Sequence, residues 1–312
     1  MGEWSKKIGE YGENVVEKFL SVIGWNEPLK GIEIKCSSQD GSHKNNDGAP
    51  VHTHGIDFLF SYMSPLVDGQ LNNIIISSKY KTTKYPNSPT KLFKDFLADL
   101  VNTIECFDNS EQKNLVLDTH KQFSSVNDVG VLFWLNNQKD SEDDLINIVA
   151  NARVDIISNK TIYLMDNKRV AFILGLMNYI KSQNSRYGYS FFYPSTGQNI
   201  NPNNRSENGK ILPVEFLNSS IIPIRLEDKN NPKEVTFFLG CIDGFEQDTF
   251  MRLMGLAKDM SKHLTGNVII AFPDYNNLEH RNIVSMAKQG FEDSKFTETI
   301  SVINFHNTLN VY

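Results

Sequence analysis

GIDFLFSYMSPLVDGQLNNIIISSKYK (residues 55–81) is the most informative segment of the chain. Its pattern predicts two short apolar strands joined by a polar connection. Asp57 lies inside the first strand, and Lys79 follows Ser77 and Ser78 at the end of the second. A charged group inside an apolar strand is costly unless it is paired, hydrogen-bonded or bound to a metal. Two such groups on neighbouring strands predict a functional site rather than a core.

An amphipathic helix is expected upstream, over residues 6–25. Its apolar positions recur at helical spacing and are Val16, Phe19, Leu20 and Ile23. Gly9 and Gly12 lie on or beside this face and lower the helix propensity, so they favour a helix that lies very close to another element. Glu13 lies at the edge of the apolar stripe, where it can point along a seam between the helix and a sheet.

Two histidines precede the strand of Asp57. His52 and His54 are two residues apart, so an extended chain points both side chains to the same face. They are candidate zinc ligands, but no Cys or further His follows at metal-site spacing. We therefore favour a pocket-rim or phosphate-contacting role for one of them, His54.

A lysine-rich segment follows Lys79 and leads into a helix with apolar residues at helical spacing between residues 92 and 104. The candidate nucleic-acid contacts in this segment are Lys81, Lys84, Lys91 and Lys94. They form a local basic face beside the predicted site. The alternative is an ordinary solvated surface.

Composition bounds the class of protein. The chain has 312 residues, 40% of them hydrophobic, and a net charge of −6, so any nucleic-acid role rests on local basic patches. The three cysteines (Cys36, Cys106 and Cys241) are far apart and without metal spacing, which favours a reducing compartment and no disulfide framework. The N-terminus lacks an apolar signal segment and no apolar run is long enough for a bilayer. We therefore expect a cytoplasmic protein without a membrane span.

The rest of the chain predicts a second α/β region. VGVLFWL (residues 129–135) is typical of a central strand covered on both faces. The polar run over residues 194–210 is the best candidate boundary. Strands and helices alternate after it, which gives a first domain over residues 1–193, a linker over 194–210 and an accessory domain over 211–312. Three acidic residues lie at or just after predicted strand ends in the accessory domain (Asp243, Glu246 and Asp274). They are candidates for a small-molecule site, although turn and helix-capping roles are the favoured interpretation.

GEYGENVVEKFLSVIGW (residues 9–25), HGIDFLF (54–60) and IIISSKYK (74–81) together resemble the PD-(D/E)XK restriction-endonuclease-like superfamily. The helix glutamate resembles the Mrr-like and Holliday-resolvase-like branches. The resemblance covers roughly the first third of the chain. It implies a mixed central sheet flanked by helices, with Asp57 as the metal aspartate, Lys79 as the catalytic lysine and Glu13 as the helix acid.

The sequence departs from the family pattern at Ser77, which stands where the family has Glu, Asp or Gln. A hydroxyl is a neutral and weaker ligand, so Ser77 puts metal affinity and activity in question, and the backbone carbonyl of Ser78 is a further candidate ligand. Mg²⁺, or Mn²⁺, suits these oxygen donors. A second assignment takes Glu33 and Lys35 as the acid and the lysine, but no aspartate strand precedes them.

The resemblance implies a metal-dependent endonuclease that hydrolyses phosphodiester bonds of double-stranded DNA. We expect it to be the effector of a bacterial anti-phage defence or restriction system, with a protein partner or a second copy of itself, and with the accessory domain binding a partner or sensing a signal. The alternative, favoured by Ser77, is a catalytically impaired nuclease fold that serves as a DNA-binding or partner-binding subunit.

Overall fold

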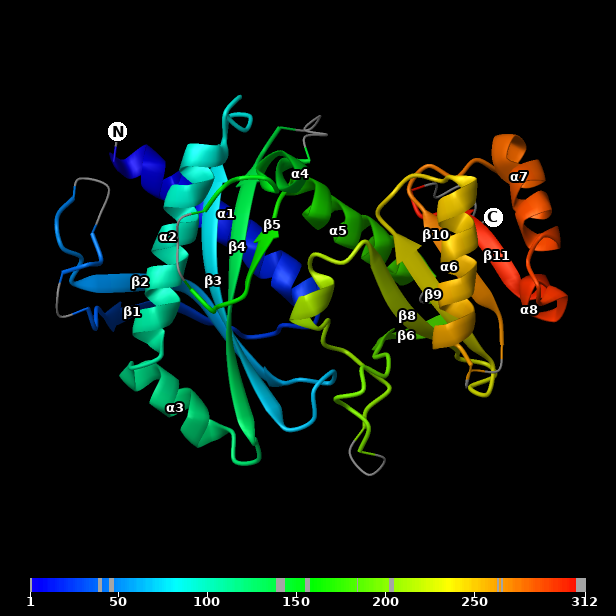
Figure 1. The fold of residues 1–312 in the computed structure, drawn as a ribbon, viewed down its shortest axis with the longest axis horizontal. Helices are drawn as coiled ribbons and strands as arrows, with labels where there is room; N and C mark the ends of the chain where they lie inside the picture. The colour runs from blue at the N-terminus through cyan, green and yellow to red at the C-terminus, as the bar shows by residue number, and fades with distance from the viewer. Residues whose placement is uncertain are drawn as a thin grey trace. The chain divides into compact units, whose positions relative to one another are not determined.

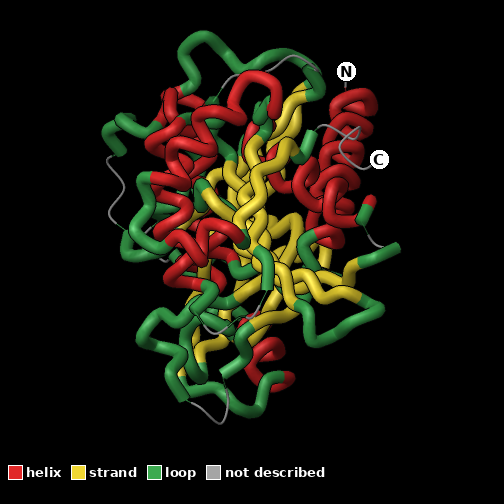
Figure 2. The backbone as a smooth tube through the Cα atoms, turned by 90° about the vertical axis from the view of Figure 1, so that its right-hand side faces the viewer, coloured by secondary structure: helices red, strands yellow, loops and turns green. Residues whose placement is uncertain are grey.

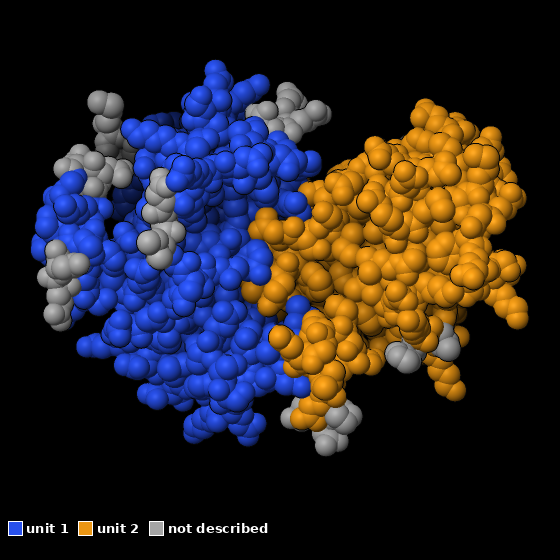
Figure 3. Space-filling view, in the orientation of Figure 1, with its two compact units in different colours: residues 1–170 blue, residues 171–312 orange. Residues whose placement is uncertain are grey.

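The computed structural model describes residues 2–38, 41–44, 48–138, 144–154, 158–183, 185–201, 205–262, 264 and 266–306. The chain divides into two compact units, Met1–Val170 and Ala171–Tyr312, coloured separately in Figure 3. Both units combine strands with helices, which Figure 2 colours by type. This confirms the predicted α/β class.

The first unit is built on a five-stranded mixed sheet. Its strands lie in the order β1 (Leu29–Lys35), β2 (Thr53–Met63), β3 (Gln70–Lys81), β4 (Ser125–Asn136) and β5 (Ile162–Met165). Strands β1, β2 and β3 pair antiparallel, whereas β3, β4 and β5 pair parallel. The two strands predicted from residues 55–81, β2 and β3, are therefore neighbours in the sheet, as predicted.

Helices α1 (Gly2–Val22) and α2 (Thr90–Phe107) cover opposite faces of this sheet (Figure 1). Side chains alternate between the faces along β3. Leu71 and Ile75 pack in one cluster with Ile104 of α2, whereas Tyr80 contacts α1 at Gly12. Shorter helices α3 (Glu111–Thr119) and α4 (Leu145–Val149) follow, and α5 (Asn167–Ser182) begins at the boundary between the units.

Helix α1 lies very close to β3 at one glycine. A Cβ atom built on Gly12 would lie 2.3 Å from Cβ of Tyr80, closer than real contacts allow. The predicted close approach is confirmed there, because only a residue without a side chain fits. Gly9 has no atom within 4 Å of such a Cβ, so packing does not explain the second glycine.

The second unit carries a six-stranded sheet. The strand order is β11 (Ile300–Asn304), β10 (Val268–Phe272), β9 (Val235–Cys241), β8 (Ile221–Asp228), β6 (Tyr187–Phe192) and β7 (Asn208–Gly209). Besides most of α5 and a 3₁₀ turn (Val214–Phe216), the unit contains α6 (Gln247–Met260), α7 (Asn277–Gln289) and α8 (Ser294–Glu298). One of the three acids considered for a small-molecule site, Asp274, accepts a hydrogen bond from the backbone amide of Phe245 at 2.7 Å. This bond fits the turn role that the sequence favoured.

The division between the units falls earlier than the boundary predicted at residue 193. Strand β6 pairs with β8 of the second sheet, and β7, inside the polar run over residues 194–210, pairs with β6. The sequence of a short apolar strand does not indicate which sheet the strand joins. The alternation of strands and helices after residue 211 therefore predicted only the later part of this unit.

Across the described parts of the chain, every helix is too short or too polar to serve as a membrane span.

Candidate active site

Asp57 lies where the first sheet is locally irregular. Lys30 and Ile32 pair with Phe58 and Ile56, so Gly31 lies opposite Asp57. Gly31 has a φ of 58°, a conformation that favours glycine. On β2, Ile56 and Leu59 both join the cluster under α2 although they are three residues apart, so the alternation is interrupted between them. The register is the same on both sides of this point, so the irregularity is confined to Gly31 and Asp57.

The Asp57 carboxylate is held by the backbone of the next strand. The amide of Ser78 donates to Oδ2 of Asp57 at 2.6 Å. Burial raises the pKa of Asp57, the Ser78 amide and the charge of Lys79 lower it, and the charge of Asp99 raises it again. The net effect is a raised pKa. The groups around Asp57 therefore do not offset the full cost of burying its negative charge.

Glu13 of α1 faces the same region. Its pKa is raised by partial burial and then by the negative charges of Asp57 and Glu10, while Lys30 lowers it. Asp57 and Glu13 are therefore close enough to repel each other as carboxylates. The structure brings together these two acids, which are 44 residues apart in the sequence.

Lys79 and Ser77 point to the face of the sheet that α2 covers. Lys79 Nζ lies 3.3 Å from Oδ2 of Asp99 and 5.5 Å from the centre of the Phe96 ring, both on α2. Ser77 is 8% exposed, and alternation puts it on the face of Lys79 with Ser78 on the other. Asp99 is a site residue that the sequence analysis missed, because an exposed acid on an amphipathic helix carries no distinguishing signal.

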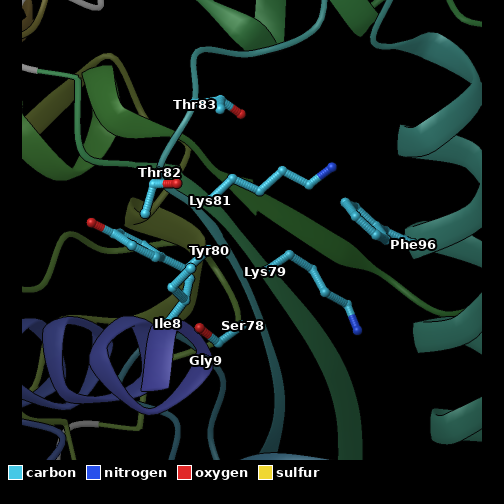
Figure 4. Close-up of a pocket in the computed structure, with 9 residues that line it drawn as sticks. All are labelled: Ile8, Gly9, Ser78, Lys79, Tyr80, Lys81, Thr82, Thr83 and Phe96. Carbon is cyan, nitrogen blue, oxygen red and sulfur yellow. The ribbon is translucent and has the colours of Figure 1, made fainter. Parts of the chain in front are cut away.

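An open groove of about 430 Å³ runs past the end of β3. Figure 4 shows Lys79 and Lys81 extending to the side of Phe96, while Tyr80 turns toward α1 at Ile8 and Gly9. The groove is lined by Ile8, Gly9, Ser78, Lys79, Tyr80, Lys81, Thr82, Thr83 and Phe96. Two ammonium groups and several hydroxyls beside an acidic pair can receive an anionic chain such as a phosphodiester.

The other predicted nucleic-acid contacts differ in position. Lys84 and Lys91 are exposed and Lys94 is half-buried. His54 is 4% exposed, and its Nε2 lies 3.3 Å from Nδ1 of His43. A phosphate contact by His54 disagrees with this placement, because the imidazole lies inside the unit rather than at its surface.

The two acids suit a divalent cation. Asp57 and Glu13 offer hard oxygen donors whose mutual repulsion a cation would offset, and Mg²⁺ uses one or two carboxylates together with waters and substrate phosphate. The raised pKa of each acid shows that the described protein groups leave this charge uncompensated. The residues present therefore fit the metal that the superfamily resemblance implies.

The alternative acid and lysine lie on the edge of the sheet. Glu33 and Lys35 belong to β1, where they pair with Gly55 and Thr53 of β2. The hydrogen bond of the Asp57 carboxylate goes instead to β3. This geometry favours Lys79 over Lys35 as the lysine of the site.

Comparison with known families supports the same part of the chain. Residues 1–169, more than half of the protein, match the family model described as GAPS4 protein PD-(D/E)XK nuclease domain. The match extends well past the segments that carry the sequence resemblance, and it does not distinguish an Mrr-like branch. A comparison with curated proteins found no match.

Proposed function

The chain belongs to the family of GAPS4 PD-(D/E)XK nuclease domains, and from this premise we propose that it is a metal-dependent endonuclease of double-stranded DNA. The observation that carries the proposal is the Asp57 carboxylate, which accepts a hydrogen bond from the Ser78 amide and interacts electrostatically with both Glu13 and Lys79. The protein acts in the cytoplasm as the effector of a bacterial anti-phage defence or restriction system. The second unit binds a partner or senses the trigger, or a second copy of the chain completes the assembly.

Each residue of the site has a role in this proposal. Asp57 and Glu13 would hold Mg²⁺ or Mn²⁺, with the Ser78 carbonyl as a further ligand. A metal held there would supply activation of water and compensation of charge on the phosphoryl group. Lys79, held by Asp99, stabilises negative charge that develops on the phosphate. Ser77 lies on the same face and supplies a hydroxyl in place of the usual acid.

Plasmid cleavage with Mn²⁺ tests the proposal. Asp57→Asn keeps the shape of the side chain and removes its charge, and we expect it to lower the cleavage rate by about 100-fold or more. Lys79→Met should have a comparable effect. The matched controls are Asp118→Asn and Lys121→Met, which change exposed residues outside the site. Full activity in Asp57→Asn would contradict the proposal.

The alternative function is that of a nuclease fold that binds DNA or a partner without cutting. Ser77, which is neutral and 8% exposed, and the ion pair of Lys79 with Asp99 favour it. Salt-dependent DNA binding without cleavage under Mg²⁺, Mn²⁺ or Ca²⁺ would support this alternative.

A further inference from the structure

Four metal-ligating side chains from distant parts of the sequence meet in the first unit. Cys36 directly follows β1, His43 lies in the connection to β2, His54 is in β2 and Cys106 is in the last turn of α2. One ligand atom from each lies within 4.8 Å of all the others. Two thiols and two imidazoles are the ligand set of a structural zinc site.

The distances between the ligand atoms match a tetrahedron around zinc. Bonds of about 2.3 Å to sulfur and about 2.0–2.1 Å to nitrogen imply edges of about 3.8 Å (S to S), about 3.6 Å (S to N) and about 3.3 Å (N to N). The Sγ atoms of Cys36 and Cys106 are 3.8 Å apart. His43 Nδ1 is 3.4 Å from each of these sulfurs and 3.3 Å from His54 Nε2. Hydrogen bonds between pairs of these side chains would not require all four ligand atoms to lie this close to one another.

The surroundings also suit a bound cation. The amide of Ser37 donates toward Sγ of Cys106 at 3.3 Å, as expected for a thiolate. The far nitrogen of His43, Nε2, lies 3.6 Å from Oε2 of Glu105, an arrangement in which a carboxylate orients a metal-bound imidazole. Cys106 is 1% exposed and His54 is 4% exposed, so the cluster is closed to solvent on that side, as in structural sites.

We propose that Cys36, His43, His54 and Cys106 bind one Zn²⁺ as a structural site. This site is separate from the acidic pair and does not depend on the nuclease activity. It joins the end of β1, the connection after it, the start of β2 and the end of α2. Asp57 comes three residues after His54, and Asp99 precedes Cys106 by seven residues. The zinc therefore fixes the strand and the helix that carry two residues of the candidate active site.

Elemental analysis of the untagged full-length protein, purified without added metal, tests the site. We expect about one zinc per chain. Cys36→Ser, Cys106→Ser and His43→Asn should each lose most of it. The matched controls are Cys241→Ala in the second unit and His52→Asn, an exposed neighbour of His54, and both should keep it. Loss of zinc equally in the controls would overturn the assignment.

A second set of measurements keeps all four ligands, in case the ligand variants do not fold. Replacement of zinc by Co²⁺ should give the visible bands of tetrahedral cobalt and a thiolate charge-transfer band. Glu105→Gln should keep the stoichiometry but weaken zinc affinity by about 10-fold. A metal-free wild-type protein, with Cys36 and Cys106 either as free thiols or joined in a disulfide, would overturn the proposal.

Discussion

At the scale of single residues, the site depends on a carboxylate that the fold places at a cost. Asp57 lies opposite Gly31, the residue with positive φ, and it accepts one amide hydrogen bond from Ser78. Burial nevertheless raises its pKa above the ordinary value of 3.8. An acid that costs stability in the folded protein is typical of a position retained for function rather than for packing.

The sign of this pKa shift gives a prediction on stability. Between 3.8 and the raised pKa, the folded state binds more protons than the unfolded state, so the free energy of unfolding falls as pH rises through that interval. Above it the full cost of the charge is present. At pH 7 without divalent metal, Asp57→Asn should therefore unfold at a temperature a few degrees higher than wild type, and the difference should vanish at acid pH.

Differential scanning calorimetry at several pH values, with a chelator and then with Mg²⁺, measures this effect. Added Mg²⁺ should raise Tm of the wild type and leave Asp57→Asn unchanged. Asp118→Asn is the control for loss of an exposed charge. A lower Tm for Asp57→Asn at pH 7 without metal would show that the carboxylate stabilises the fold, against this argument.

At the scale of elements, the site depends on how closely α1 packs on β3. Gly12 admits the ring of Tyr80, and Phe19 further along the helix meets Phe133 of β4 with ring centres 5.5 Å apart. Glu13 follows Gly12 directly, so the distance between helix and sheet sets the position of this acid. The lysine on the other face is fixed by α2, through Asp99 and Phe96.

A pair of glycine substitutions tests this close approach. Gly12→Ala places a Cβ 2.3 Å from Tyr80 and should lower the free energy of unfolding by about 1–3 kcal/mol, the usual cost of overpacking. Gly9→Ala meets no atom within 4 Å and should raise it by about 0.5–1 kcal/mol through helix propensity. Urea unfolding of both variants measures the difference, and equal effects would contradict the packing argument.

At the scale of the whole molecule, charge is distributed unevenly. The chain carries a net charge of −6, yet Lys79 and Lys81 line one groove and Lys84 and Lys91 follow within twelve residues. In the function that we propose, affinity for DNA comes from a local patch against an unfavourable overall charge. We expect such binding to weaken at high salt.

Salt titration of DNA binding tests the local patch. Each lysine that contacts phosphate contributes about 0.9 to the slope of log affinity against log salt concentration. Lys81→Gln and Lys91→Gln should each reduce the slope by about that amount, whereas Lys121→Gln, an exposed lysine before β4, should leave it unchanged. The measurement is made with Ca²⁺ to separate binding from cleavage. Equal slopes in all three variants would remove the patch from the interface.

The amino-acid pattern alone predicts the two strands around residues 55–81, the amphipathic helix before them and the α/β class, because hydrophobic periodicity is a local property. It also determined the contact of α1 at Gly12, and it indicated Asp57 and Lys79 as residues too polar for their strands. Asp99 lay outside its reach, since its role depends on which helix crosses the end of β3. The boundary between the units could not be predicted from the sequence either, because it depends on the pairing of β6 with β8.

The cluster of Cys36, His43, His54 and Cys106 can be recognised only in the folded chain. The residues are separated by 7, 11 and 52 positions, so the sequence analysis found no metal spacing and expected His54 at a phosphate. Spacing rules describe ligands that share one short turn or hairpin. Here the residue after β1, the connection to β2, β2 itself and α2 each supply one ligand. Only the packing of α2 on the sheet brings the last sulfur within reach of the others.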